Sequence, residues 1–137
     1  MAKIVPNEGK VAIQKVIYDN LPTLYLRLFK SNYTPGDNTT LADLEAIEAD
    51  FSGYLAVDLD GSSFPDPGLA AAKAKVIADN WAQFSHNGGG TDNDVYGWWI
   101  DDGTKVWAAE VWDTPVTMDP DALPIALKVV DTLDSEV

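Results

Sequence analysis

The pattern of hydrophobic and polar positions is clearest between Val95 and Trp112, a stretch that reads VYGWWIDDGTKVWAAEVW. Two runs rich in aromatic and β-branched residues, Val95–Ile100 and Lys105–Trp112, flank the polar tetrad Asp101–Thr104. The Asp-Gly pair in this tetrad is typical of tight hairpin turns, because Gly103 can adopt a positive φ at little steric cost. We therefore predict a β-hairpin. It carries four of the five tryptophans, and burying that much apolar surface requires a second sheet or a partner chain.

Two segments have the pattern of short helices. Residues Gly9–Leu21 carry an apolar stripe with i, i+3, i+4 and i+8 spacing, which is one helical face, and Pro22 ends this helix. The stripe consists of Ile13, Val16, Ile17 and Leu21. A capping box at Thr40–Asp43 opens a second helix that runs to about Glu48, with Leu41, Leu44 and Ile47 pointing inward. The first ten residues, 1–10, are expected to form an extended N-terminal arm.

The other apolar runs are expected to form short strands. Leu24–Lys30 alternates two largely apolar sets of side chains, which is typical of a strand in the middle of a sheet. The alanines of residues 69–84 suit a helix, but we favour a strand because the neighbouring segments are strands. The further expected strands are 55–58, 115–118 and 124–133. Turns and loops are expected at 31–39, 62–68, 86–94 and 120–123, with a frayed tail at 134–137.

About six to eight short strands with one or two short helices predict an all-β, mainly antiparallel fold. We expect a jelly-roll-like β-sandwich. The chain has 137 residues and no cysteine, so it can bury a core without disulfide bonds. No internal repeat or linker is visible, and residues 11–137 are expected to form a single domain.

The charge balance limits the partners. Nine Lys and Arg residues against 22 Asp and Glu residues give a formal net charge of −13. Nucleic-acid-binding proteins need clustered cations, whereas this chain has Arg27 and scattered lysines, and an anionic membrane would repel it. No run approaches the length of a membrane span, and the N-terminus lacks the pattern of a signal peptide. We therefore expect no nucleic-acid or membrane partner, and synthesis in the cytoplasm.

Three groups of residues are candidates for chemistry, and each has a simpler interpretation. His86 is the single histidine. No acid or nucleophile lies at a sequence spacing that would indicate catalysis, so we expect a loop histidine without a catalytic role. Residues 58–62 (DLDGS) are similar to the start of a calcium loop, but the twelfth position would be Leu69 rather than an acid. A β-turn is the better interpretation, although a weak calcium site stays open. Asp101 and Asp102 do not suit a glycosidase, because adjacent residues on a hairpin tip are solvated and point apart. We predict no catalytic, cofactor-binding or metal-binding residue.

The aromatic residues of the hairpin allow two interpretations. Trp98, Trp99, Trp107 and Trp112, together with Tyr96, could form a sugar-stacking platform or could pack in the core. Trp98 and Trp99 are adjacent and point to opposite faces of the strand, so at most one of them faces the core if the other face is exposed. An exposed remainder would be an interface or a ligand patch.

Three stretches together carry a resemblance to a known group of proteins. They are YLRLFKSNYTP at 25–35, LADLE with FSGY at 41–45 and 51–54, and the hairpin strands with WAAEVWDTPV at 107–116. In this order they resemble small virion proteins of tailed bacteriophages, over about Gly9 to Val130. Trp112 stands where the pattern has phenylalanine. Some proteins of this kind look like capsid decoration, or cement, proteins with a jelly-roll-type sandwich.

The resemblance implies a phage structural protein that binds the outer capsid surface and stabilises the head. Its partners would be the major capsid protein and further copies of the chain in a homo-oligomer on the particle, and its location would be the capsid exterior. Such a protein is not an enzyme and needs no cofactor, and the arm 1–10 would lie across a neighbouring subunit. The alternative is a tail-associated or host-receptor virion protein that binds carbohydrate through an exposed tryptophan face.

Overall fold

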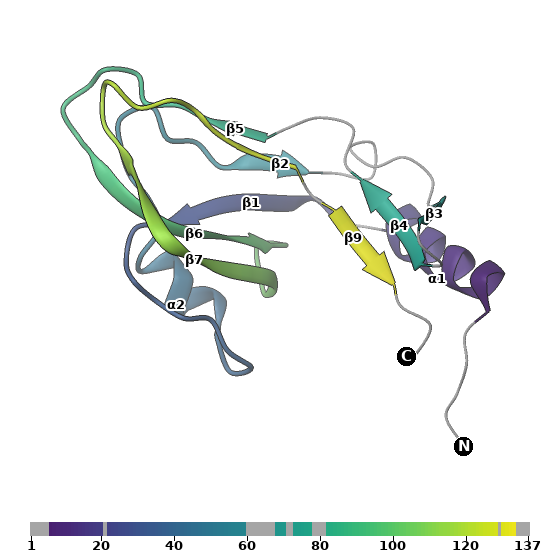
Figure 1. Ribbon diagram of the computed structural model, residues 1–137. Helices are drawn as coiled ribbons and strands as arrows, with labels where there is room; N and C mark the ends of the chain where they lie inside the picture. Colours follow the sequence, from purple (N-terminus) through teal and green to yellow (C-terminus); the bar gives the residue numbers. More distant parts are fainter. Residues whose placement is uncertain are drawn as a thin grey trace. The chain divides into compact units, whose positions relative to one another are not determined.

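The computed structural model describes residues 6–20, 22–59, 68–70, 73–77, 82–128 and 130–133. These residues form mainly antiparallel sheets with two helices (Figure 1), which confirms the all-β, mainly antiparallel class. The chain divides into two compact units. Unit 1 comprises Met1–Pro22, Asp60–Trp81 and Leu127–Val137, and unit 2 comprises Thr23–Leu59 and Ala82–Ala126. The single domain expected for residues 11–137 stays a prediction.

A four-stranded antiparallel sheet is the centre of unit 2. Its strand order is β2-β1-β6-β7, so the segment Leu24–Lys30 lies in the middle of a sheet as predicted. The predicted hairpin is also confirmed, because β6 and β7 pair on either side of the turn at Gly103, which has a φ of 88°. The strands are β1 (Leu24–Phe29), β2 (Val57–Leu59), β6 (Asn93–Asp101) and β7 (Val106–Met118).

Helix α2 (Leu41–Glu45) packs on one face of this sheet (Figure 1). The predicted capping box is present, because the Thr40 side chain accepts from the Asp43 N–H and the Asp43 side chain accepts from the Thr40 N–H. Leu44 lies fully buried against Phe29 and Trp99. Leu41 and Ile47 pack around this cluster as expected, and the helix ends earlier than Glu48.

The hairpin strand β7 bends where its pairing with β6 is interrupted. Gly97 pairs with Val111, but the next paired residues are Val95 and Val116, so β7 uses more residues than β6 over this stretch. A Cβ at Gly97 would collide with the Glu110 carbonyl oxygen and the Phe29 ring, so the close approach requires glycine. β5 (Ala82–Phe84) and β8 (Ile125–Leu127) form a two-stranded sheet, and β5 and the first two residues of β8 belong to unit 2.

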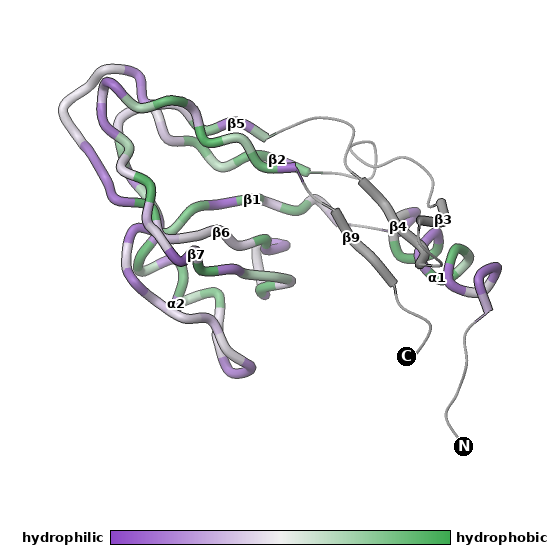
Figure 2. Tube along the Cα trace, in the orientation of Figure 1, coloured by the Kyte–Doolittle hydropathy of each residue, from purple (hydrophilic) through white to green (hydrophobic). Residues whose placement is uncertain are grey.

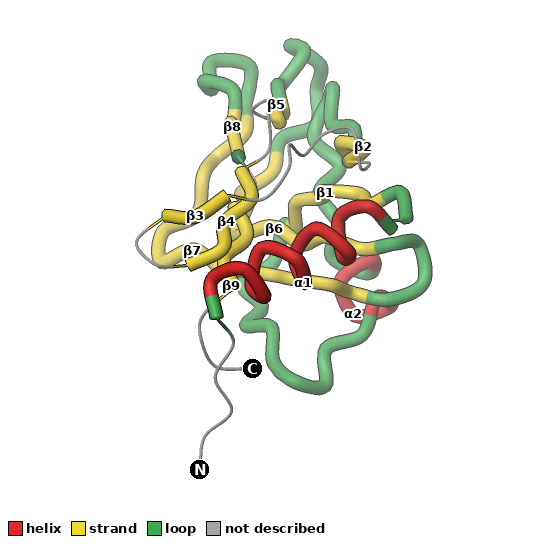
Figure 3. The backbone as a smooth tube through the Cα atoms, turned by 90° about the vertical axis from the view of Figure 1, so that its right-hand side faces the viewer, coloured by secondary structure: helices red, strands yellow, loops and turns green. Residues whose placement is uncertain are grey.

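Unit 1 contains helix α1 and a three-stranded antiparallel sheet, β3-β4-β9 (Figure 3). Helix α1 contacts β3 and β4. The elements are α1 (Asn7–Asp19), β3 (Gly68–Ala70), β4 (Lys73–Ile77) and β9 (Val130–Leu133). The helix begins at Asn7, so residues 7–10 are helical and do not belong to an extended arm.

The structure differs in detail from two of the predicted strands, 69–84 and 124–133. The described parts of residues 69–84 are strands, as favoured over the helical alternative, and they form β3, β4 and β5. The single strand predicted for 124–133 is wrong in its continuity, because the chain passes from the sheet of β8 to the sheet of β9 within it. The predicted arm residues 1–5, the loop residues 62–67 and the tail 134–137 lie outside the described residues.

The apolar stripe of α1 does not face its sheet. Among the described side chains of this helix, Lys10 and Gln14 are buried, whereas Ile13, Val16 and Ile17 are exposed. Figure 2 shows hydrophobic and hydrophilic residues alternating along α1. The helix is therefore amphipathic as its periodicity predicts, but the tertiary structure buries Lys10 and Gln14 and leaves the apolar stripe exposed.

Candidate binding surface at the tryptophan hairpin

The turn of the hairpin is anchored from inside by Asp101, which is 1% exposed. Its Oδ2 accepts hydrogen bonds from Arg27 Nε at 2.9 Å and from Trp99 Nε1 at 2.8 Å. Its Oδ1 accepts from the Gly103 N–H at 2.8 Å. The expectation that Asp101 is solvated is therefore wrong, because the arginine and the indole N–H replace the water that a buried carboxylate loses.

Arg27 connects the hairpin to the rest of unit 2. Besides Asp101, its Nη1 donates to Glu48 Oε2 at 3.1 Å, and its guanidinium lies 5.1 Å from the centre of the Tyr25 ring. Burial by itself lowers the pKa of Arg27, but the hydrogen bonds and charges of Glu48 and Asp101 outweigh it, so the pKa is raised. The guanidinium thus stays charged and holds two carboxylates of different segments together.

Tyr54 completes this network at the far side of Glu48. Its hydroxyl donates to Glu48 Oε2 at 2.8 Å and accepts from the Leu28 N–H at 3.1 Å. Burial is the main cause of the raised pKa of Tyr54, so its hydroxyl keeps its proton. No local pattern in the sequence predicts the network of Arg27, Glu48 and Tyr54. The one signal that points to it is the position of the chain's single arginine in a largely apolar strand.

Asp102 holds the outer side of the same turn. Its Oδ1 accepts from the Thr104 and Lys105 N–H groups, each at 2.8 Å, and its Oδ2 accepts from Trp107 Nε1 at 3.1 Å. The hydrogen bonds from Lys105, Trp107 and Thr104, in that order, lower the pKa of Asp102 to about 2. This confirms a turn role for Asp102, and Asp101 and Asp102 do point to different partners.

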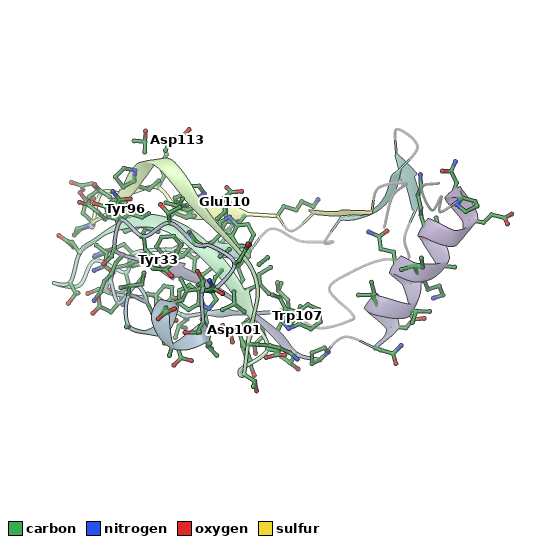
Figure 4. All side chains as sticks on the ribbon, turned by 90° about the horizontal axis from the view of Figure 1, so that it is seen from below. Tyr33, Tyr96, Asp101, Trp107, Glu110 and Asp113 are labelled. Atoms are coloured by element: carbon green, nitrogen blue, oxygen red, sulfur yellow. The ribbon has the colours of Figure 1, made fainter. Side chains whose placement is uncertain are left out.

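Trp107 is the tryptophan that this turn presents to solvent. Its side chain is 45% exposed, and the hydrogen bond to Asp102 fixes the direction of its indole ring. Figure 4 shows Trp107 and Asp113 at separate places along β7. An indole that is exposed yet held in one orientation can contact a partner with little loss of conformational entropy.

A shallow cavity of about 350 Å³ lies beside Trp107. Its walls are the start of β7, from Val106 to Ala109, and the loop from Pro35 to Thr39. The loop is braced by Thr39 Oγ1, which accepts from the Gly36 N–H at 2.8 Å and lies 3.0 Å from the Tyr33 hydroxyl. The cavity therefore has one aromatic wall and one polar wall on a fixed backbone.

The other hairpin aromatics divide between core and surface. Trp99 is fully buried, whereas Trp98 on the opposite face is partly buried, as the alternation predicts. Tyr96 packs beside the cluster of Phe29, Leu44 and Trp99. Trp112 is partly buried at the bend of β7. The five rings thus do not form one platform, and Trp107 is the large exposed ring among them.

His86 has a structural environment in the loop between β5 and β6. Its Nδ1 accepts from the Gly88 N–H at 2.9 Å, and its Nε2 lies 3.0 Å from both the Thr91 carbonyl oxygen and Asp92 Oδ1. The ring also stacks on Phe51. His86 lies in a loop as expected, and the loop folds back so that Asp92 contacts the ring.

The calcium-loop alternative is only partly covered by the structure. Asp58 lies in β2, paired with Tyr25 of β1, and residues 60–62 lie outside the described residues. Within the described ranges, no group of three His, Asp or Glu side chains lies close enough to hold a metal ion. In the same ranges no helix has the length and apolar character needed to cross a lipid bilayer.

Comparisons with known proteins give no relative for this chain, since neither a family model nor a curated protein nor a solved structure matches it. Its function is therefore inferred from the residues and geometry described above.

Proposed function

We propose that this chain is a phage structural protein, a capsid decoration protein that binds the outer capsid surface and stabilises the head. Its partners in this proposal are the major capsid protein and further copies of the chain on the particle. A jelly-roll-like arrangement of the sheets belongs to the same proposal, as does a location on the capsid exterior. The resemblance of the stretches at 25–35, 41–54 and 95–116 to virion proteins supports it.

The observation that carries the proposal is the exposed Trp107 on a rigid hairpin. Tryptophan is enriched among the residues that dominate protein–protein binding energy. The turn beneath it is tied to the sheet by Asp101, Arg27 and Glu48, so the ring is already in place before a partner arrives. Such preorganisation suits a protein whose role is to bind rather than to change a substrate.

The acidic character of the chain fits a position outside a DNA-filled particle. With a formal net charge of −13, the protein is repelled by DNA and by other polyanions. A decoration protein also needs only modest affinity at each contact, because many neighbouring attachments raise the effective concentration.

Sedimentation with capsid shells tests the proposal. Purified protein is mixed with bare, expanded shells assembled from the coat protein encoded in the same genome, and bound protein is measured in the pellet. We expect binding, and a higher temperature of shell rupture. Trp107→Ala should weaken binding by about thirtyfold, as expected for a central interface tryptophan, whereas Leu55→Ala, at an exposed position outside this hairpin, should not. Absence of wild-type binding across several salt concentrations contradicts the proposal.

One observation favours a second function, carbohydrate binding by a tail-associated or host-receptor protein. The cavity beside Trp107 combines an aromatic wall with Asp37 and Thr39, and sugars stack on aromatic rings while their hydroxyls bind polar groups. Titration with oligosaccharides, with tryptophan fluorescence as the readout, distinguishes carbohydrate binding from the decoration function. A saturable change that is lost in Trp107→Ala supports sugar binding, and no change at millimolar sugar contradicts it.

A further inference from the structure

A second groove lies on β7 beyond its bend. Its volume is about 480 Å³. One wall consists of the β7 residues Trp112, Thr114, Val116 and Thr117. The other wall is the segment Ala122–Ile125, which follows the turn after β7. This groove belongs entirely to unit 2 and shares no lining residue with the cavity beside Trp107.

The groove exposes large apolar side chains on both walls. Leu123 is 84% exposed on one wall, and Val116 is 39% exposed on the other. Ile125 is buried and Trp112 is partly buried. Scattered exposed apolar residues are ordinary on a protein surface, but apolar residues gathered around a hollow mark binding sites.

The two segments that line the groove belong to an acidic stretch of the sequence. No lysine or arginine occurs from Val106 to Leu127, whereas the same stretch contains Glu110, Asp113, Asp119 and Asp121. Figure 4 shows Asp113 at the bend of β7 and Glu110 further along the strand. The rim is also ordered, because Thr117 Oγ1 donates to Asp94 Oδ1 at 2.7 Å and the Asp121 N–H donates to Asp119 Oδ1 at 3.0 Å.

We propose that this groove is a docking site for an extended apolar segment of a partner protein that is flanked by lysine or arginine. The apolar walls take the hydrophobic side chains, and the acidic rim attracts the flanking cations. Charge complementarity of this kind selects partners and speeds their encounter. A second copy of this chain that docked through the same face is the poorer occupant, because its residues 106–127 would bring acidic side chains and no lysine or arginine to the groove. The inference rests on the groove and does not depend on the proposed capsid role.

Two synthetic peptides test the charge requirement. Both contain the same short run of alternating leucine and valine, flanked by two lysines in one peptide and by two glutamates in the other. Binding to the full chain is measured by titration calorimetry at low and at high salt. We expect the lysine peptide to bind about tenfold more tightly, since two ion pairs at the rim together contribute about one order of magnitude. High salt should reduce this difference.

Matched variants locate the site. Leu123→Ser should weaken binding of the lysine peptide by about thirtyfold, because serine lacks the apolar surface that Leu123 buries against the peptide. Leu55→Ser, at a leucine that is 78% exposed but not part of the groove, should bind like the wild type. Val116→Thr is the second groove variant, used if Leu123→Ser does not fold. Asp113→Asn combined with Asp121→Asn should remove most of the preference for lysine over glutamate flanks.

Preferential binding of the lysine peptide that is lost in Leu123→Ser and kept in Leu55→Ser supports the proposal. Equal binding of both peptides, unchanged binding in Leu123→Ser, or no binding of the lysine peptide up to millimolar concentration overturns it. Concentration-dependent self-association that Leu123→Ser abolishes would assign the groove to a second copy and would overturn it as well.

Discussion

Replacement of Asp101 by asparagine is the most informative test of how the hairpin is held. The change keeps the size of the side chain but removes its charge. In the wild type, one carboxylate oxygen of Asp101 accepts hydrogen bonds from Arg27 and Trp99, and the other accepts one from the Gly103 N–H. An asparagine has a single acceptor oxygen, so its NH₂ group must face at least one of these donors.

The expected loss of stability follows from burial. Removing one partner of a buried ion pair costs about 3–5 kcal/mol. Here the Arg27 side chain is 25% exposed and keeps its contact with Glu48 at 3.1 Å, so solvent and Glu48 compensate in part. We therefore expect Asp101→Asn to destabilise unit 2 by about 2–3 kcal/mol, which corresponds to a melting temperature lower by about 10 °C.

Urea unfolding followed by tryptophan fluorescence measures this loss, because Trp99 is buried beside Asp101. Asp113→Asn is the control on the same hairpin. Asp113 is exposed, and its replacement should change stability by no more than about 0.5 kcal/mol. A double-mutant cycle with Arg27→Met should show that the two losses are not additive, because each variant removes the same ion pair.

Either of two results would show that the ion pair of Asp101 and Arg27 does not hold the hairpin. One is a loss in Asp101→Asn no larger than that in Asp113→Asn. The other is strict additivity with Arg27→Met, since independent losses would mean that the two side chains do not stabilise one another in solution.

Three further predictions concern other parts of unit 2. Folding lowers the pKa of Asp102 from 3.8 to about 2, so its contribution to stability is present above about pH 4 and is lost as the pH falls toward 2. Urea midpoints of Asp102→Asn and wild type should differ near neutral pH and converge in acid; parallel curves would contradict this. Gly97→Ala should destabilise by more than about 2 kcal/mol, because the added methyl group meets the Glu110 carbonyl and the Phe29 ring; a near-neutral melting temperature would exclude the clash. Thr40→Ala removes the capping box of α2 and should cost about 1 kcal/mol in urea unfolding, and an unchanged midpoint would show that packing of Leu44 alone holds this helix.

Local features of unit 2 were readable from the sequence by itself. The hairpin around Gly103, the capping box at Thr40 and the central strand Leu24–Phe29 depend on residues that are neighbours in the chain. Turn conformation, helix capping and the alternation of apolar residues are set by such neighbours. For this reason the class of fold and most element positions could be predicted.

Contacts between distant residues were decided only by the tertiary structure. Arg27 and Asp101 are 74 residues apart in the sequence, so no local pattern predicts that Asp101 is buried rather than solvated. The same holds for α1, where Lys10 and Gln14 are buried and Ile13 is exposed. Periodicity determines which residues share a face, but only packing against other elements determines which face is turned toward the core.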